Sequence, residues 1–290
     1  MTGILPVNKY AGITSHTATS KIKRLTKEKC GHFGTLDPMV MGVLPVLIGK
    51  ATKLSDFMIT DKQYKAVIQL GLHTDTLDIT GNILQTDDKK FPDMAELENA
   101  LKINTGKILQ TPPQISAIKI GGVSAYKLAR KGIEVPIAPR SAEIFSIILT
   151  DVNAEQKTFS ITVDCSKGTY IRTLAKDIAE SLGTIGTLKE MTRTYSGGIS
   201  LENCVDLEEI EKNSEKIQQY LIPPQEYFKN FPRITIPKEG VTYYLNGGII
   251  SLDRIKNFTK QELYIAFDDN EFLGLAAIKE ENIKAVWNLL

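Results

Sequence analysis

The sequence predicts an α+β protein in two parts, a large region that combines helices with a sheet and a small C-terminal β module. Helix and strand patterns both occur before a proline-rich joint at 222–224, and short strand patterns follow it. The length of 290 residues, at roughly 150 residues per domain, also indicates two domains. We therefore expect one domain over residues 1–228 and a β-barrel-like domain over residues 232–290.

Helix patterns occur at four places. A basic helix capped by Ser15 is expected over 16–25, because Ala18, Ile22 and Leu25 recur at helical spacing. The other three patterns are a short helix that starts at Pro92–Asp93, a helix over 171–182 that ends at Gly183, and an acidic helix from Asp206.

Strand patterns are clearest at two places in the large region. In 64–70, apolar residues alternate with Lys65, Val67 and Gln69, so Tyr64 shares one face with Ala66 and Ile68. Phe159 to Cys165 alternates in the same way. Beyond the joint, strands are expected over 233–236, 263–267 and 272–278.

Composition and charge restrict the class of protein. Hydrophobic residues make up 42% and charged residues 24% of the chain, which is typical of a globular protein and excludes a disordered one. The net charge of +1 hides a strong polarity along the chain. Residues 1–60 hold eight basic and three acidic residues, and residues 119–140 hold five basic and one acidic, whereas residues 201–230 hold three basic and seven acidic. Such basic segments suit a polyanion, although solvated helix faces would look the same.

Other sequence features predict a cytoplasmic protein without a metal or nucleotide cofactor. Three widely spaced cysteines do not suggest a disulfide framework, and Met1 to Gly12 has no signal-peptide pattern. No stretch is long enough to cross a bilayer. Cys30 and His32 lack a second ligand cluster for zinc, and the spacing from Gly42 to Lys50 does not fit a phosphate loop.

The segment from Gly31 to Pro45 contains the best candidate for chemistry. Its glycines and prolines predict irregular structure before Val43, and Pro38 favours an extended backbone at Asp37. Apolar neighbours should limit the access of water to this carboxylate, which must then be protonated or paired with a cation. Spacing alone is equally compatible with an ordinary Asx turn.

Here the chain resembles the TruB family of pseudouridine synthases. The Asp37 loop resembles the catalytic-aspartate motif of that family, and other segments match its remaining motifs in the same order. These segments are Leu5 to Ser15, Lys62 to Lys65, Gly71 to Gly81, Gln114 to Pro136 and Ser166 to Thr173, so that the resemblance covers roughly residues 3–200. Phe33, Val40 and Met191-Thr192 depart from the usual family residues.

The resemblance implies a fold and an activity. The fold is the pseudouridine synthase fold, a mixed and mainly antiparallel sheet flanked by helices, followed by a PUA-type RNA-binding module. The activity is isomerisation of uridine to pseudouridine at position 55 in the T-loop of transfer RNA, without a cofactor. The partner is the T-stem-loop, and we expect a monomer. Two alternatives stay open, an RNA-binding or RNA-folding factor of TruB type, and a related synthase that acts on other RNAs.

The resemblance also implies roles for single residues. Asp37 acts on the ribose of a uridine flipped out of the stack, either as nucleophile at C1′ or as base at C2′. Arg172 pairs with Asp37, and Tyr64 stacks on the extruded base. Four further substrate-binding residues are expected, namely His32 in the gap left in the RNA, Tyr170 and Met191 at the pocket, and Lys9 at phosphates, the last together with Lys21, Lys23 and Arg24. Residues 119–140 could form a flap over the RNA loop.

Overall fold

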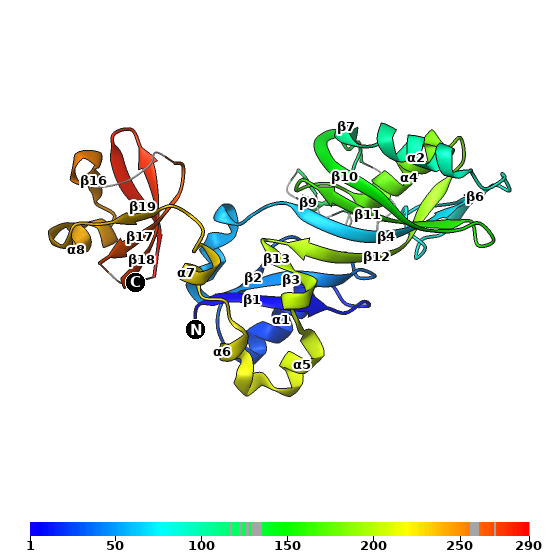
Figure 1. Ribbon diagram of the computed structural model, residues 1–290. Coiled ribbons are helices and arrows are strands. Elements are labelled where there is room, and N and C mark those ends of the chain that lie inside the picture. Colours follow the sequence, from blue (N-terminus) through cyan, green and yellow to red (C-terminus); the bar gives the residue numbers. More distant parts are fainter. Residues whose placement is uncertain are drawn as a thin grey trace.

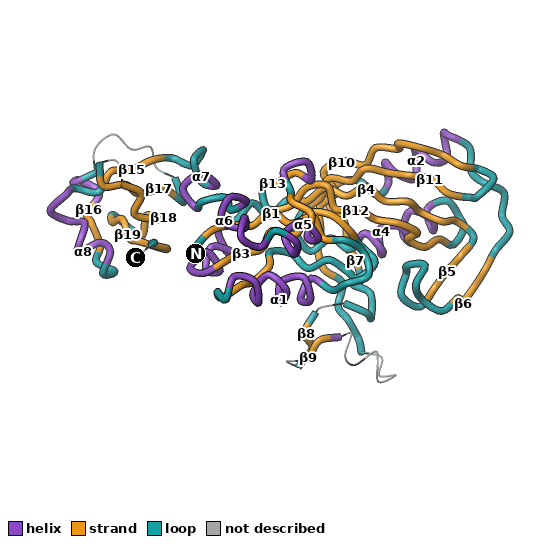
Figure 2. The backbone as a smooth tube through the Cα atoms, turned by 90° about the horizontal axis from the view of Figure 1, so that it is seen from below, coloured by secondary structure: helices purple, strands orange, loops and turns teal. Residues whose placement is uncertain are grey.

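The computed structural model describes residues 1–289 except 117, 122, 126–127, 129–134, 256–260 and 270. It contains a ten-stranded sheet before residue 207 and a five-stranded sheet after residue 232, each with its own hydrophobic core. The five-stranded sheet lies at one end of the molecule, on the side of the N-terminus, in both views (Figures 1 and 2).

The large sheet is mixed and mainly antiparallel. Its strands are β1 (Gly3–Lys9), β2 (Cys30–His32), β3 (Met41–Ile48), β4 (Lys62–Leu70), β7 (Gly106–Gln110), β10 (Arg140–Asn153), β11 (Thr158–Cys165), β12 (Gly186–Ser196), β13 (Ile199–Ser200) and β14 (Val205–Asp206). Their order is β14-β1-β3-β12-β4-β11-β10-β7, with β2 added to β3 and β13 to β12. Only the pairs β1 with β14 and β3 with β12 are parallel among the described strands of this sheet.

The strands β4 and β11 confirm the alternation seen in the sequence. Tyr64, Ala66 and Ile68 are buried, whereas Lys65 on the other face is exposed. In the segment from Gly31 to Pro45 the prediction of irregular structure before Val43 is wrong at both ends, because 30–32 pair with β3 as strand β2 and β3 itself begins at Met41.

Three helices pack on this sheet, α1 (Ser15–Thr26), α2 (Met94–Ile103) and α4 (Ile171–Ser181). The predicted cap of α1 is wrong by one residue, since the hydroxyl of Thr14 accepts the hydrogen bond from the Thr17 amide at 2.9 Å. Asp93 and Glu96 form a reciprocal capping box at the start of α2.

The helix α4 follows β11 and packs on β12, while α2 packs on α4 and β10. The predicted apolar stripe of α4 is confirmed, since Leu174, Ala175 and Ile178 are buried. Gly183, with a φ of +69°, ends the helical segment as expected. The start of α4 therefore has a fixed place above the sheet, which matters for Arg172.

The acidic segment after Asp206 is not one helix. It forms α5 (Leu207–Lys212), the 3-10 helix η3 (Ser214–Lys216), α6 (Ile217–Tyr220) and α7 (Pro224–Tyr227). Asn213 ends α5, and two consecutive prolines separate α6 from α7 because proline has no amide hydrogen to donate inside a helix.

The C-terminal sheet has the strand order β15-β17-β18-β19-β16. Its strands are β15 (Arg233–Thr235), β16 (Ile249–Ser251), β17 (Tyr264–Asp268), β18 (Glu271–Lys279) and β19 (Asn282–Asn288). The three predicted strands are confirmed, whereas β16 and β19 were not predicted. The short helix α8 (Val241–Leu245) packs on β16 and β19.

The two sheets are connected through a shared apolar cluster. The 3-10 helix η1 (Gly49–Phe57) places Leu54 against Phe228 and Trp287, and the Trp287 indole donates to the Lys50 carbonyl at 3.0 Å.

The remaining described elements are β5 (Leu72–Thr74), β6 (Ile83–Thr86), β8 (Lys119–Ile120), β9 (Val123–Ser124), η2 (Leu201–Asn203), η4 (Lys238–Gly240) and η5 (Leu252–Arg254).

Candidate active site

A pocket of about 640 Å³ opens where the loop after β2, the start of β4 and the start of α4 meet. Five of the seven predicted site residues line it, namely Asp37, Tyr64, Tyr170, Arg172 and Met191. These residues come from four separate parts of the chain, so the fold brings together what the sequence keeps far apart.

The loop that carries Asp37 is anchored on both sides of that residue, since the Gly12 amide donates to the Pro38 carbonyl at 2.8 Å and Ser15 binds Leu36. The Ser15 hydroxyl accepts a hydrogen bond from the Leu36 amide at 2.7 Å and lies 3.1 Å from the Leu36 carbonyl. Leu36 and Val40 are buried, whereas the Asp37 side chain keeps 37% of its surface exposed. The carboxylate therefore lies at the pocket wall, open to a ligand but poorly hydrated.

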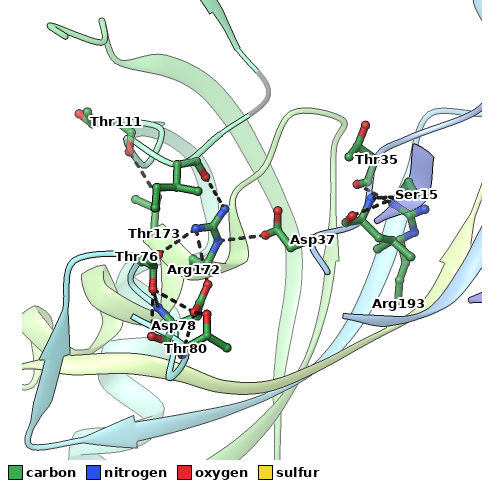
Figure 3. A network of polar contacts seen from close by, with 12 residues as sticks. Ser15, Thr35, Asp37, Thr76, Asp78, Thr80, Thr111, Arg172, Thr173 and Arg193 are labelled. Atoms are coloured by element: carbon green, nitrogen blue, oxygen red, sulfur yellow. Dashed lines mark hydrogen bonds and ion pairs between the residues drawn. The ribbon is translucent and has the colours of Figure 1, made fainter. Parts of the chain in front are cut away.

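Arg172 pairs with Asp37, as the sequence predicted. Its Nε lies 3.0 Å from Asp37 Oδ2, and its side chain is only 4% exposed. The two terminal nitrogens donate to the carbonyls of Thr76 and Ile115, each at 2.8 Å. These three contacts fix the plane of the guanidinium, and Figure 3 shows the Asp37 carboxylate pointing toward it.

A second carboxylate, Asp78, lies behind Arg172. Its Oδ2 is 3.6 Å from Arg172 Nη1, and its other oxygen accepts hydrogen bonds from the hydroxyls of Thr76 and Thr80. Asp78 was not among the predicted site residues. The available signal was its place among threonines in the segment 71–81, but only the fold shows that this segment lies beside α4.

The electrostatics of Asp37 combine two opposing influences. Burial raises the pKa of the Asp37 carboxyl above its ordinary value, and the neighbouring Arg172 guanidinium acts in the opposite direction. An ionised carboxylate that is poorly hydrated and held by one charge-assisted contact retains a free oxygen for chemistry.

Tyr64 forms part of the pocket but is only 6% exposed. Its Cα lies opposite Val163 in β11 and Arg193 in β12, so both neighbouring strands fix its place. Burial raises the pKa of the Tyr64 phenol, which keeps the hydroxyl protonated.

Two lysines at the pocket, Lys62 and Lys167, were not predicted. Lys167 is exposed, whereas Lys62 is half-buried and donates to the Thr60 carbonyl at 2.8 Å. Burial, helped by the charge of Arg193, lowers the pKa of Lys62 to about 8. Cations at the rim of a pocket suit a negatively charged ligand.

The prediction that Lys9 neutralises phosphates is wrong. Its side chain is fully buried, and its Nζ donates to the carbonyls of Tyr10 and Ile13, each at 2.9 Å, and of Pro38 at 3.4 Å. The ammonium group therefore holds the backbone just after Asp37 and cannot reach a ligand without unfolding this region.

His32 lies outside the pocket lining. Its Nδ1 is 3.0 Å from the Thr19 hydroxyl and its Nε2 is 3.3 Å from the Thr35 hydroxyl, so the ring connects α1 to the catalytic loop. Burial and the charge of Arg193 lower the pKa of His32, which favours the neutral ring.

Three further observations bear on the sequence predictions. Several basic residues of 119–140, namely Lys127, Arg130 and Lys131, lie outside the described residues, so the flap stays a prediction. Within the described ranges, no group of three or more His, Cys, Asp or Glu is placed to hold a metal ion. None of the helices in that same part of the chain has the length and apolarity needed to cross a bilayer.

Comparison with known proteins gives three kinds of match. A family model described as TruB family pseudouridylate synthase (N terminal domain) matches residues 22–171. The tRNA pseudouridine synthase B of Clostridium tetani is 39% identical over 292 residues, which cover 99% of each chain. That of Listeria monocytogenes is 40% identical over 257 residues, which cover 86% of this chain and 84% of that protein.

Solved structures match over most of the chain. A chain of a Cbf5-Nop10-Gar1 complex has a TM-score of 0.72 at 24% identity and covers 95% of this chain and 78% of its own. A chain of an H/ACA RNP bound to a substrate RNA containing 2′-deoxyuridine has a TM-score of 0.72 at 20% identity. The match covers 99% of this chain and 85% of that chain. Likenesses at this level of identity show a common fold.

Proposed function

The chain belongs to the TruB family of pseudouridylate synthases, and from this premise we propose that it isomerises uridine to pseudouridine at position 55 in the T-loop of transfer RNA. The observation that carries the proposal is the ion pair of Asp37 with a buried Arg172 on the wall of a pocket large enough for one nucleotide. The predicted fold class is confirmed by the family and by the structural likenesses.

The geometry supports a reaction that starts at the ribose. Asp37 keeps one oxygen free while Arg172 holds the other, so the carboxylate can attack C1′ or remove the proton at C2′. Either route cleaves the bond from N1 to C1′, after which the uracil turns and joins C1′ through C5. The proton lost from C5 balances the proton gained at N1, so the product is an isomer of the substrate.

Two carboxylates line the pocket, and of these only Asp37 is paired with a buried arginine, whereas Asp56 is exposed. A glycosidase of the usual kind needs a second carboxyl group for the leaving group or for water. Asp78 does not supply it, because it is buried behind Arg172, with one oxygen facing that arginine and the other accepting from Thr76 and Thr80. This arrangement favours isomerisation over hydrolysis.

Residues of the pocket would bind the base once it leaves the stack. Tyr64 stacks on the uracil, and Tyr170 and Met191 close the pocket around it. The backbone of Tyr170 is held by the Gln110 side chain, whose oxygen accepts from the Tyr170 amide at 3.0 Å. His32, which ends β2 and lies outside the pocket lining, supports the RNA where the base has left.

The remaining roles concern the RNA and the division of the chain. Lys23 and Arg24 on α1 are exposed and can meet phosphates, whereas Lys21 is paired with Glu211 at 2.7 Å. We propose domains over residues 1–228 and 232–290, with the second contacting RNA as a PUA-type module. The protein would act on the T-stem-loop as a monomer in the cytoplasm.

Tritium release tests the proposed function. A tRNA transcript labelled with tritium at C5 of uridine should release label at position 55 when the protein is added, because the C5 proton is lost. A matched transcript with cytidine at position 55 should release none. Release without dependence on position 55 would indicate a synthase for other RNAs, and binding without release would indicate an RNA-folding factor.

A further inference from the structure

Arg193 is the largest completely buried side chain in the described part of the chain. None of the ion pairs found among the described residues includes it. A buried cation without a counter-charge is costly to fold unless dense hydrogen bonding replaces its lost water. The hydrogen-bond partners of Arg193 therefore indicate its role.

The guanidinium of Arg193 binds backbone on both sides of Asp37. Its Nη2 donates to the Gly34 carbonyl at 2.8 Å and its Nη1 to the Thr35 carbonyl at 3.4 Å. Its Nε donates to the Val43 carbonyl at 2.8 Å. A single rigid group thus connects the segment that enters the Asp37 loop to the strand that leaves it.

The backbone around Arg193 brings three strands together at this point. In β12, Arg193 pairs with Gly42 of β3 on one side and with Tyr64 of β4 on the other. Gly42 has a φ of +111°, and a Cβ there would lie 2.2 Å from the Arg193 carbonyl oxygen. Only glycine permits this approach of β3 to β12.

Because Arg193 and Tyr64 are directly opposite each other in β12 and β4, their side chains leave the sheet on the same face. The charge of the guanidinium lowers the pKa of Tyr64, against the larger effect of burial. In Figure 3, Arg193 lies on the far side of the Asp37 loop from Arg172. Arg193 is therefore in contact with the two structural units that hold Asp37 and Tyr64, yet it does not line the pocket.

We propose that Arg193 is a positioning residue, whose buried guanidinium fixes the Asp37 loop relative to Tyr64. This role rests on the proposed function, because it requires a base on Tyr64 and its ribose at Asp37 at the same time. A displacement of about 1 Å between reacting groups can cost roughly 10²-fold in rate. Loss of the Arg193 guanidinium should therefore slow the chemical step more than it weakens RNA binding.

Two variants and one matched control test the proposal. Arg193→Met fills similar space without donors, and Arg193→Lys keeps the charge but cannot span three carbonyls. Asn104→Ala is the control, because Asn104 is also buried, donates at 2.8 Å to the Ala100 carbonyl and does not line the pocket. The measurements are the melting temperature, the dissociation constant for tRNA and the single-turnover rate of tritium release at a temperature where each variant is folded.

We expect the single-turnover rate to fall about 10²-fold in Arg193→Met and about 10-fold in Arg193→Lys, with tRNA affinity within about three-fold of wild type. Asn104→Ala should keep the rate within about two-fold at a comparable loss of melting temperature. A structural role alone would lower the melting temperature in all three without this separation of rate from affinity.

Three outcomes would overturn the role of Arg193. These are a folded Arg193→Met with a rate near wild type, a failure of both Arg193 variants to fold, and equal loss of rate in Asn104→Ala. If the wild-type protein is active, none of these three outcomes contradicts the proposed function. An inactive wild-type protein would overturn the proposed function and this role together.

Discussion

Two buried arginines flank the Asp37 loop, and they have opposite surroundings. Arg172 faces two carboxylates, at 3.0 Å from Asp37 and 3.6 Å from Asp78, in addition to two backbone carbonyls. Arg193 faces backbone carbonyls, and the described residues include no ion-pair partner for it. A guanidinium among carboxylates mainly sets their charge, whereas one among carbonyls mainly sets where the backbone lies. The site separates these two tasks between its two sides.

The largest expected effect on the Arg172 side is that of Arg172→Met, which leaves Asp37 and the buried Asp78 without a counter-charge. Removing one partner of a buried ion pair costs about 3–5 kcal/mol, which corresponds to roughly 10²–10⁴-fold when expressed in the single-turnover rate. The pKa of Asp37 should also rise further, so the loss of activity as pH falls should begin at a higher pH than in wild type. A pH profile of the rate measures both, and an unshifted acid limb would contradict the charge-setting role.

A smaller effect is expected from Asp78→Asn, which removes one negative charge but keeps the shape of the side chain. Hydrogen bonds and contacts to charged groups contribute about 1.5–3 kcal/mol, so the rate should fall roughly 10- to 100-fold. Asp75→Asn in the same loop is the control, because Asp75 is exposed and bonds only Asn82 among the described residues. Equal losses in both variants would mean that loop stability, not charge at Arg172, is responsible.

On the Arg193 side, Lys62 allows a test by pH. Its pKa of about 8 lies below that of an ordinary lysine, so its charge, and with it affinity for RNA, should decrease as pH rises through about 8. Lys62→Met should remove this pH dependence. Lys65→Met, on the exposed face of the same strand, should retain it. Measurement of tRNA affinity at pH values on both sides of about 8 would show whether Lys62 contacts the RNA.

The smallest effects concern cations outside the pocket. Lys23→Ala and Arg24→Ala should each reduce the slope of log affinity against log salt by about one, if each side chain neutralises one phosphate. Lys21→Ala is a suitable control, since Lys21 is already paired with Glu211 and should change the slope less. An unchanged slope in all three variants would remove α1 from the RNA-binding surface.

Much of the fold could be predicted from the sequence because local patterns determine it. The alternation in 64–70 and 159–165, and the helical spacing after Ile171, were each confirmed. The errors occurred where tertiary contacts decide, as at β2, which becomes a strand only because β3 lies beside it. The short strand β16 was missed since its three residues show no period.

The site was predicted less completely for the same reason. Asp37, Tyr64 and Arg172 belong to long motifs and were found by resemblance. Asp78 lies beside Arg172 although the two are 94 positions apart, and Arg193 binds Thr35 of the Asp37 loop from 158 positions away, and no local pattern indicates such contacts. Lys9 shows the converse error, because a lysine near a predicted site suggests a phosphate contact until its burial is known.

The central claim is that the Asp37 carboxylate performs the isomerisation. The most direct test is the single-turnover rate of tritium release from C5-labelled tRNA by Asp37→Asn, with Asp56→Asn on the rim of the same pocket as the matched control. We predict no detectable release by Asp37→Asn with tRNA binding largely retained, and near wild-type release by Asp56→Asn. Release by Asp37→Asn at a rate close to that of wild type would contradict the claim.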